Sequence, residues 1–133
     1  MIRLATLEDI DAIFRIYQDV TNKSMVDIVK NTLIDFTENI KCKNIYVYEK
    51  DFVKAYALFY DHNTYVYIEQ LCVLKKYRNE GIGKKLLLFF NIKWDLVEVC
   101  CHITDKSTIE FVEKCGFVSS NQITSWYYKV KNP

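Results

Sequence analysis

The alternation of apolar and polar residues divides the chain into short strands and amphipathic helices. Runs rich in β-branched and aromatic residues, typical of strands, cover 2–5, 45–48, 53–60, 65–74, 95–102 and 124–130. Apolar residues recur at helical spacing over 10–17, 22–41, 86–94 and 104–115. Polar turn residues stand at 50–51 and 61–63. The pattern predicts a mixed α/β chain whose strands from 45 to 74 form an antiparallel meander.

Two predicted helices have residues suited to capping at one end. Thr6 and Asp9 fit an N-cap pattern before the helix at 10–17, although Glu or Gln is the usual partner residue. Gly116 follows the helix at 104–115 at a position that suits the C′ residue.

The stretch from Tyr67 to Phe90 reads as strand, basic loop and helix, and it indicates an anion site. The first N–H groups of a helix have no partner within the helix and carry a partial positive charge. Gly81 and Gly83 lack a Cβ, so a ligand can approach the backbone closely. Arg78 and Lys84 add positive charge. These features suit a phosphate group, and a solvated turn whose glycines cap the strand is the structural alternative.

The spacing of the glycines excludes two familiar phosphate-binding loops. A P-loop needs a glycine five residues before its Gly-Lys pair and a Ser or Thr after it, where this chain has Arg78 and Lys85. A dinucleotide-binding fingerprint needs a third glycine where this chain has Leu86.

Two segments resemble motifs of the GNAT family of N-acetyltransferases. Residues 71–73, Leu-Cys-Val, followed by 78–83, Arg-Asn-Glu-Gly-Ile-Gly, resemble the family's acyl-CoA-binding motif Arg/Gln-x-x-Gly-x-Gly/Ala. Residues 111–117, Phe-Val-Glu-Lys-Cys-Gly-Phe, resemble the family's Phe-Tyr-Glu-Lys-x-Gly-Phe segment. The two motifs occur in the family's order and spacing, and the general layout of residues 1–130 agrees with it.

The resemblance implies a fold and a cosubstrate. The implied GNAT fold is mixed α+β, with a central, mostly antiparallel sheet, helices on both faces, and two strands, at 65–73 and 97–102, that splay apart. Acetyl-CoA is the implied cosubstrate, with its pantetheine arm between those strands. The residues implied to bind it are Leu71, Cys72, Val73, Arg78, Asn79, Glu80, Gly81, Ile82, Gly83, Lys84, Asp105 and Phe111. Phe111 is equally suited to a core position.

The implied reaction is transfer of an acetyl group to a primary amine by direct attack, without a covalent enzyme intermediate. The Val73 N–H is the expected oxyanion donor. Glu69 is the expected general base, and it shares a strand face with Leu71 unless a bulge intervenes. Residues 67–73 together with 77–83 especially resemble the spermidine/spermine acetyltransferase branch, in which a glutamate has this role. Glu98 is the second candidate base, and pairing of Glu69 with a lysine across the sheet is the structural alternative.

Two residues depart from the family pattern. Val112 stands where many members have a tyrosine that protonates the leaving thiolate, and Tyr127 or Tyr128 could replace it. Asp105 replaces an asparagine that usually binds the pantetheine arm, so it keeps an acceptor, loses a donor and adds negative charge. These departures favour the alternative of a catalytically inactive acyl-CoA-binding sensor or scaffold. A phosphate-binding fold unrelated to the family is the third hypothesis.

Composition limits the kind of protein and its partners. A chain of 133 residues predicts a single domain over 1–133. Its net charge of +1 gives no reason to expect a nucleic-acid partner, and its apolar runs are too short to cross a membrane. The five cysteines lack metal-site spacing and favour reduced thiols in a cytoplasmic protein, so no metal is expected. The expected partners are a small-molecule amine or a protein N-terminal amine, and by analogy a second copy in a homodimer.

Overall fold

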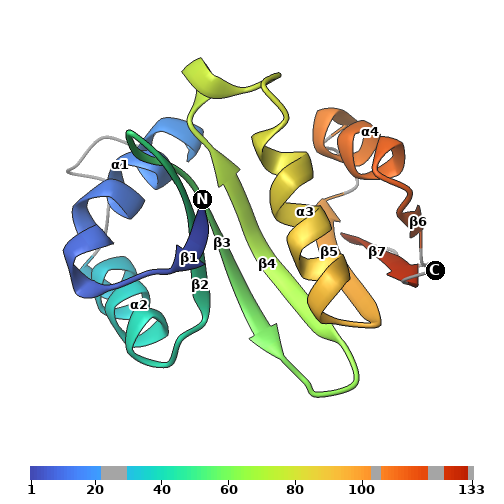
Figure 1. The fold of residues 1–133 in the computed structure, drawn as a ribbon, viewed down its shortest axis with the longest axis horizontal. Helices are drawn as coiled ribbons and strands as arrows, with labels where there is room; N and C mark the ends of the chain where they lie inside the picture. Colours follow the sequence, from blue (N-terminus) through green and yellow to red (C-terminus); the bar gives the residue numbers. More distant parts are fainter. Residues whose placement is uncertain (22–29, 103–105, 120–124, 132–133) are drawn as a thin grey trace. The chain divides into compact units, whose positions relative to one another are not determined.

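The computed structural model describes residues 1–21, 30–102, 106–119 and 125–131 (Figure 1). Its backbone contacts group into two compact units. Unit 1 contains residues 1–58 and 70–86, and unit 2 contains residues 59–69 and 87–133. A single domain over the whole chain stays a prediction.

Unit 1 is built from an antiparallel sheet and two helices. Its elements are β1 (Ile2–Leu4), the 3-10 turn η1 (Leu7–Asp9), α1 (Ile10–Thr21), α2 (Lys30–Lys41), β2 (Ile45–Lys50), most of β3 (Phe52–Asp61), the end of β4 (Val66–Val73), the 3-10 turn η2 (Lys75–Tyr77) and the start of α3 (Ile82–Lys93). The strand order in this unit is β1-β2-β3-β4. The β1–β2 and β2–β3 pairs are antiparallel, with Ile2 opposite Tyr48 and Tyr46 opposite Ala57.

Unit 2 contains the parallel strand pair of the fold. Its elements are the end of β3, the start of β4, the rest of α3, β5 (Leu96–His102), α4 (Lys106–Lys114), β6 (Val118–Ser119) and β7 (Ser125–Lys131), in the strand order β3-β4-β5-β7-β6. β4 and β5 are parallel, whereas β7 is antiparallel to β5 and to β6. The predicted mixed fold with a mostly antiparallel sheet is therefore confirmed.

The predicted strands agree with the observed ones to within one or two residues. Helix α1 continues to Thr21, beyond the predicted 10–17, and α3 begins at Ile82, before the predicted 86–94. The second helix was expected from position 22 and is described from Lys30, because residues 22–29 lie outside the described part. The start of α4 at 104 or 105 also lies outside it. β6 was not predicted, since a strand of two residues has no periodicity to detect.

The core of unit 1 lies between the sheet and helices α1 and α2. Edge-to-face aromatic contacts join Phe36 to Phe14, Tyr17 and Tyr56, with ring centroids 5.4, 5.6 and 5.7 Å apart. Tyr56 is fully buried and Phe36 nearly so. Such contacts favour one arrangement of the rings, so the hydroxyl of Tyr56 on β3 is held in a fixed position.

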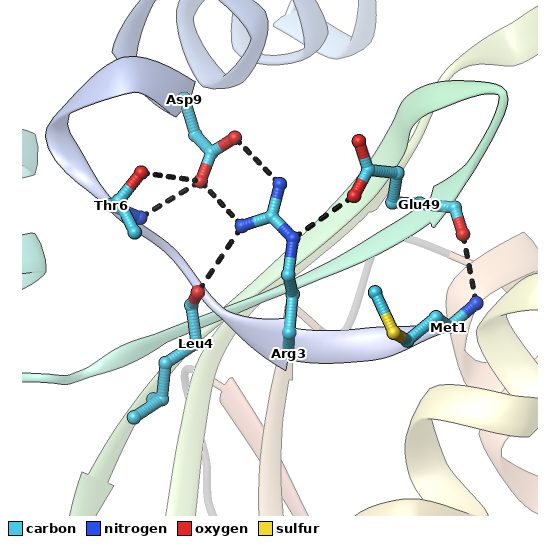
Figure 2. Close-up of polar contacts among 6 residues, drawn as sticks. All are labelled: Met1, Arg3, Leu4, Thr6, Asp9 and Glu49. Atoms are coloured by element: carbon cyan, nitrogen blue, oxygen red, sulfur yellow. Dashed lines mark hydrogen bonds and ion pairs between the residues drawn. The ribbon is translucent and has the colours of Figure 1, made fainter.

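Arg3 ties β1 to η1 and to β2 (Figure 2). Its Nη1 and Nη2 donate to the two carboxylate oxygens of Asp9 at 2.8 and 3.0 Å, and its Nε donates to Glu49 Oε1 at 3.0 Å. Oδ2 of Asp9 also accepts the Thr6 N–H at 2.8 Å, so Thr6 and Asp9 form the predicted cap. The hydrogen bond from the Arg3 guanidinium holds the pKa of Asp9 below its usual value, against the opposing effect of burial.

Gly116 is the C′ residue that terminates α4, as the sequence predicted. Gly116 has φ +93° and donates its N–H to Glu113, while the Phe117 N–H donates to the Val112 carbonyl. This is the Schellman arrangement, in which a left-handed C′ residue lets the last helical carbonyls find donors.

Candidate active site

The loop between β4 and α3 places a helix N-terminus beside a residue with a left-handed backbone. Asn79 and Gly81 have φ values of +67° and +81°. The Lys85 N–H donates to the Gly81 carbonyl at 3.0 Å, so the intrahelical bonds of α3 begin there. The N–H groups of residues 82–84 in the first turn precede that bond and are available to a ligand. Gly83 lies inside α3 and needs no positive φ.

Two contacts that the sequence did not predict hold this loop in place. The Lys75 N–H donates to Asp19 Oδ2 of α1 at 2.7 Å. The Nε of Arg78 donates to the Val73 carbonyl at 3.2 Å. The loop is thus anchored both to α1 and to the end of β4. Neither partner could be found from spacing, because Asp19 and Lys75 are 56 positions apart.

In the part of β4 that belongs to unit 1, the backbone N–H groups of Leu71 and Val73 point away from β3. The Leu74 N–H donates to the Lys54 carbonyl of β3 at 3.0 Å. Because successive N–H groups of a strand point to opposite edges, the N–H groups of Val73 and Leu71 point to the other edge. The predicted oxyanion donor therefore has a direction that suits a ligand lying along that edge.

Side chains at the end of β4 alternate between two faces. Leu71 and Val73 pack with Ile82 and Leu86 of α3, together with Tyr48 and Ala55. Cys72 packs into the core formed with α1 and α2, where burial raises the pKa of its thiol. Cys72 is therefore a protonated core residue whose contribution along β4 is its backbone.

Gln70 joins this second face through a short hydrogen bond. The Tyr56 hydroxyl donates to Gln70 Oε1 at 2.6 Å. Burial is the main cause of a raised pKa for Tyr56, so the phenol stays protonated and able to donate.

The two candidate bases lie on one face of unit 2. The Tyr60 hydroxyl donates to Glu69 Oε2 at 3.1 Å, and Glu69 is exposed. Glu98 of β5 stands opposite Tyr67 of β4 in the parallel register. Since Tyr67 and Glu69 are two strand positions apart, all three side chains point to the same face. Glu98 is half-buried and flanked in sequence by two buried valines.

Two backbone hydrogen bonds indicate a β-bulge in β4. The His62 N–H donates to Tyr65 near the hairpin, and the Leu74 N–H donates to Lys54 at the other end. Counted from bond to bond, the β3 side of the pair spans the nine residues 54–62 and the β4 side spans the ten residues 65–74. The β4 side therefore carries one extra residue.

The side-chain contacts locate the bulge at Glu69 and Gln70. These consecutive residues contact Tyr60 and Tyr56, which lie four positions apart on β3 and so share a face. Glu69 and Leu71 are expected to share a face unless a bulge intervenes, and the bulge does intervene, so the two side chains lie on opposite faces. The role of Glu69 as base stays a prediction.

The remaining candidate residues belong to unit 2 or fall outside the described chain. Phe111 of α4 is half-buried, and Val112 is fully buried. Asp105 lies outside the described residues, as do the side chains of Tyr127 and Tyr128. The parallel register of β4 with β5 runs from Val66–Val97 to Ile68–Val99, and splaying beyond it stays a prediction.

The described part of the chain lacks a side-chain cluster for a metal ion and a helix that could span a membrane. No group of three or more His, Cys, Asp or Glu side chains in this part of the chain is placed to hold a metal ion. None of the helices it contains is long and apolar enough to cross a membrane.

The sequence matches one family model. That model, described as an acetyltransferase (GNAT) domain, matches residues 41–119, which is more than half of the 133-residue chain. No curated protein sequence gives a significant match.

Solved structures share the fold at low sequence identity. A GNAT-family acetyltransferase from Bacillus cereus superposes with a TM-score of 0.83 at 13% identity, covering 100% of this chain and 97% of the other. YncA from Salmonella typhimurium, a putative acetyltransferase with its cofactor acetyl-CoA, gives 0.76 at 16%, covering 100% and 94%. PaiA N-acetyltransferase from Thermoplasma acidophilum, in complex with coenzyme A, gives 0.80 at 14%, covering 98% of each. At these identities the likeness shows the fold.

Proposed function

The chain belongs to the GNAT acetyltransferase family, and from this premise we propose that it transfers an acetyl group from acetyl-CoA to a primary amine. The observation that carries the proposal is the geometry of unit 1 at the end of β4. There the available N–H groups of residues 82–84 follow Gly81, and the Val73 N–H points to the edge away from β3. The first feature suits a diphosphate, and the second suits the carbonyl oxygen of a thioester.

The proposed reaction is a direct transfer without a covalent enzyme intermediate. Glu69 takes a proton from the ammonium form of the acceptor, directly or through a water. The neutral amine then attacks the thioester carbon while the Val73 N–H stabilises the oxyanion, at a benefit of about 3 kcal/mol if aligned. The new C–N bond forms, the C–S bond breaks, coenzyme A departs as a thiolate, and the second proton of the amine nitrogen passes to water. A thiol pKa near ~8.5 makes this departure feasible without an acid, which fits the buried Val112.

Calorimetric titration with acetyl-CoA, with CoA and ATP as controls, tests the cofactor part of the proposal. Saturable binding at one site is expected, and a bulky residue at Gly81 should weaken it. Absence of binding at high concentration would contradict it. A mass-spectrometric assay with a panel of amines, run on the wild type and on Glu69→Gln, then tests turnover.

The second candidate function is an acyl-CoA-binding module without turnover. The buried valine at the position of the family's usual acid favours it. Acetyl-CoA binding together with equal inactivity of the wild type and Glu69→Gln toward every amine would support this candidate. Turnover by the wild type that is lost in Glu69→Gln would exclude it.

A further inference from the structure

Gln70 presents hydrogen-bond donors on the face of β4 opposite to α3. In the described part of the chain its amide makes one hydrogen bond, in which Oε1 accepts from the Tyr56 hydroxyl. A primary amide has a carbonyl acceptor and two N–H donors. With the acceptor occupied, the Nε2 group is the part of the half-buried Gln70 that remains for a ligand.

The buried Tyr56, which donates to the Gln70 amide, fixes the orientation of that amide. Tyr56 is fully buried, and its ring packs edge to face against Phe36. The half-buried Cys72 packs against the same core. Because the Tyr56 hydroxyl holds the Oε1 side of the amide, Nε2 points away from the phenol.

The location of Gln70 suits the acceptor rather than the cofactor. The helix N-terminus that suits a diphosphate belongs to α3, whose Ile82 and Leu86 pack on the Leu71 and Val73 face. Gln70 points to the other face, with Tyr56. Three residues of strand separate Gln70 from Val73, or about 10 Å. The Gln70 side chain covers part of that distance, and a small acceptor whose amine lies near Val73 covers the rest.

We propose that Gln70 is a specificity-determining residue and that the acceptor is a primary amine with a carbonyl group on the neighbouring carbon, as in an amino-acid amide or a peptide N-terminus. This inference rests on the proposed acetyl transfer. Nε2 donates to the substrate carbonyl and orients the amine for attack. A polyamine has no acceptor for Nε2, and its second ammonium group would face another donor, so it is the disfavoured class.

The test compares acceptors in the wild type and in Gln70→Glu. Alaninamide, a short peptide that begins with alanine, and 1,4-diaminobutane are each assayed for kcat/KM by mass spectrometry. The wild type should prefer the two carbonyl-bearing amines by about tenfold or more, the worth of one well-formed hydrogen bond. Gln70→Glu replaces the donors with a carboxylate, so it should lower kcat/KM for alaninamide about tenfold and raise it for the diamine. The ratio of the alaninamide and peptide values distinguishes a small acceptor from a polypeptide one.

Tyr56→Phe is the matched control for the orientation of the amide. The ring packing is kept and only the hydrogen bond to Gln70 is lost. We therefore expect kcat/KM for alaninamide to fall about threefold, mainly because KM rises. Acetyl-CoA affinity should be unchanged in both variants, which shows that the fold and the cofactor site are intact.

The outcomes separate this inference from the proposed function. A wild type that acetylates the diamine as well as alaninamide, with a ratio that Gln70→Glu leaves unchanged, overturns the inference while acetyl transfer stands. A wild type that binds acetyl-CoA but acetylates none of these or other amines overturns the transfer reaction, and the inference with it.

Discussion

The Tyr60 hydroxyl donates a hydrogen bond to Oε2 of Glu69 across the β3–β4 pair, with 3.1 Å between the two oxygens. A carboxylate that accepts such a bond keeps a defined rotamer while its second oxygen stays open to a substrate. The pair therefore links the proposed base to the neighbouring strand, and it can be tested one partner at a time.

Changing Glu69 to Gln should abolish turnover and spare cofactor binding. The amide has nearly the same shape but cannot accept a proton, so a loss of about 10²–10⁴-fold in kcat is expected. Acetyl-CoA affinity, measured by calorimetry, should not change. Tyr60→Phe leaves the base and removes only its positioning bond, so its kcat should fall by less than about tenfold. An equal loss in the two variants would contradict the assignment of Glu69 as the base.

Substitutions of Gly81 should distinguish the cost of a left-handed backbone, seen in stability, from obstruction of the cofactor, seen in acetyl-CoA binding. Gly81 has φ +81°, and a Cβ at this position would meet no atom within 4 Å. Gly81→Val should lower the free energy of unfolding by about 1–2 kcal/mol, because left-handed backbone is costly for a branched residue. Gly81→Asn should cost less, since Asn tolerates that conformation. Both side chains should weaken acetyl-CoA binding by obstructing the loop. Unaltered binding by the Asn variant would refute close approach of the cofactor here.

The bond from the Lys75 N–H to Asp19 should contribute to cofactor affinity. Asp19→Ala leaves the start of η2 without this partner, and the dissociation constant for acetyl-CoA should rise about three- to tenfold. Asp19→Asn keeps an acceptor oxygen and should stay within about twofold of the wild type. Calorimetry on the three proteins measures this difference. If the Ala variant binds as the wild type does, the loop does not depend on α1 for its conformation.

The Arg3–Asp9 pair should stabilise the fold in a pH-dependent way. Folding lowers the pKa of Asp9 from its ordinary value of 3.8. The stabilisation that the Asp9 carboxylate gives the folded state is therefore complete above the unfolded pKa, and it is lost as the pH falls through the folded pKa. Arg3→Met should lower the free energy of unfolding by about 1–3 kcal/mol near neutral pH. The difference from the wild type should shrink as the pH is lowered below about 4.

Urea unfolding at several pH values measures this difference, with Asp9→Asn as the control that removes the titrating group. A loss of the same size at every pH would show that the Asp9 charge is not the cause.

Much of the fold was accessible from the sequence because its signals are local. The positive φ of Gly81 and Gly116 follows from glycines placed between a strand and a helix or after a helix. The alternation of apolar residues marked β3 and β4 to within one or two positions of their observed ends. The family motif indicated the order of strand, loop and helix at 71–86, and the structure has this order in β4, η2 and α3.

The contacts around the site were not accessible in the same way. The partners of Glu69, Gln70 and Lys75 depend on strand register and on packing between distant segments. A bulge leaves no mark in composition, since Glu69 and Gln70 both fit a regular strand. For this reason the sequence left open whether Glu69 shares a face with Leu71, although both residues were correctly placed on one strand.

The extra residue in β4 makes this strand sensitive to length as well as to chemistry. Removing one residue at the bulge would let β4 pair regularly with β3, and Leu71 and Val73 would keep the α3 side because the alternation of faces would then be uninterrupted. The deletion would instead remove one of the two consecutive side chains that now share a face with Tyr56 and Tyr60. The strand can therefore present both Glu69 and Gln70 on that face only while its residue count is preserved, so a deletion there would remove a site residue from a sequence whose loop motif still looks complete.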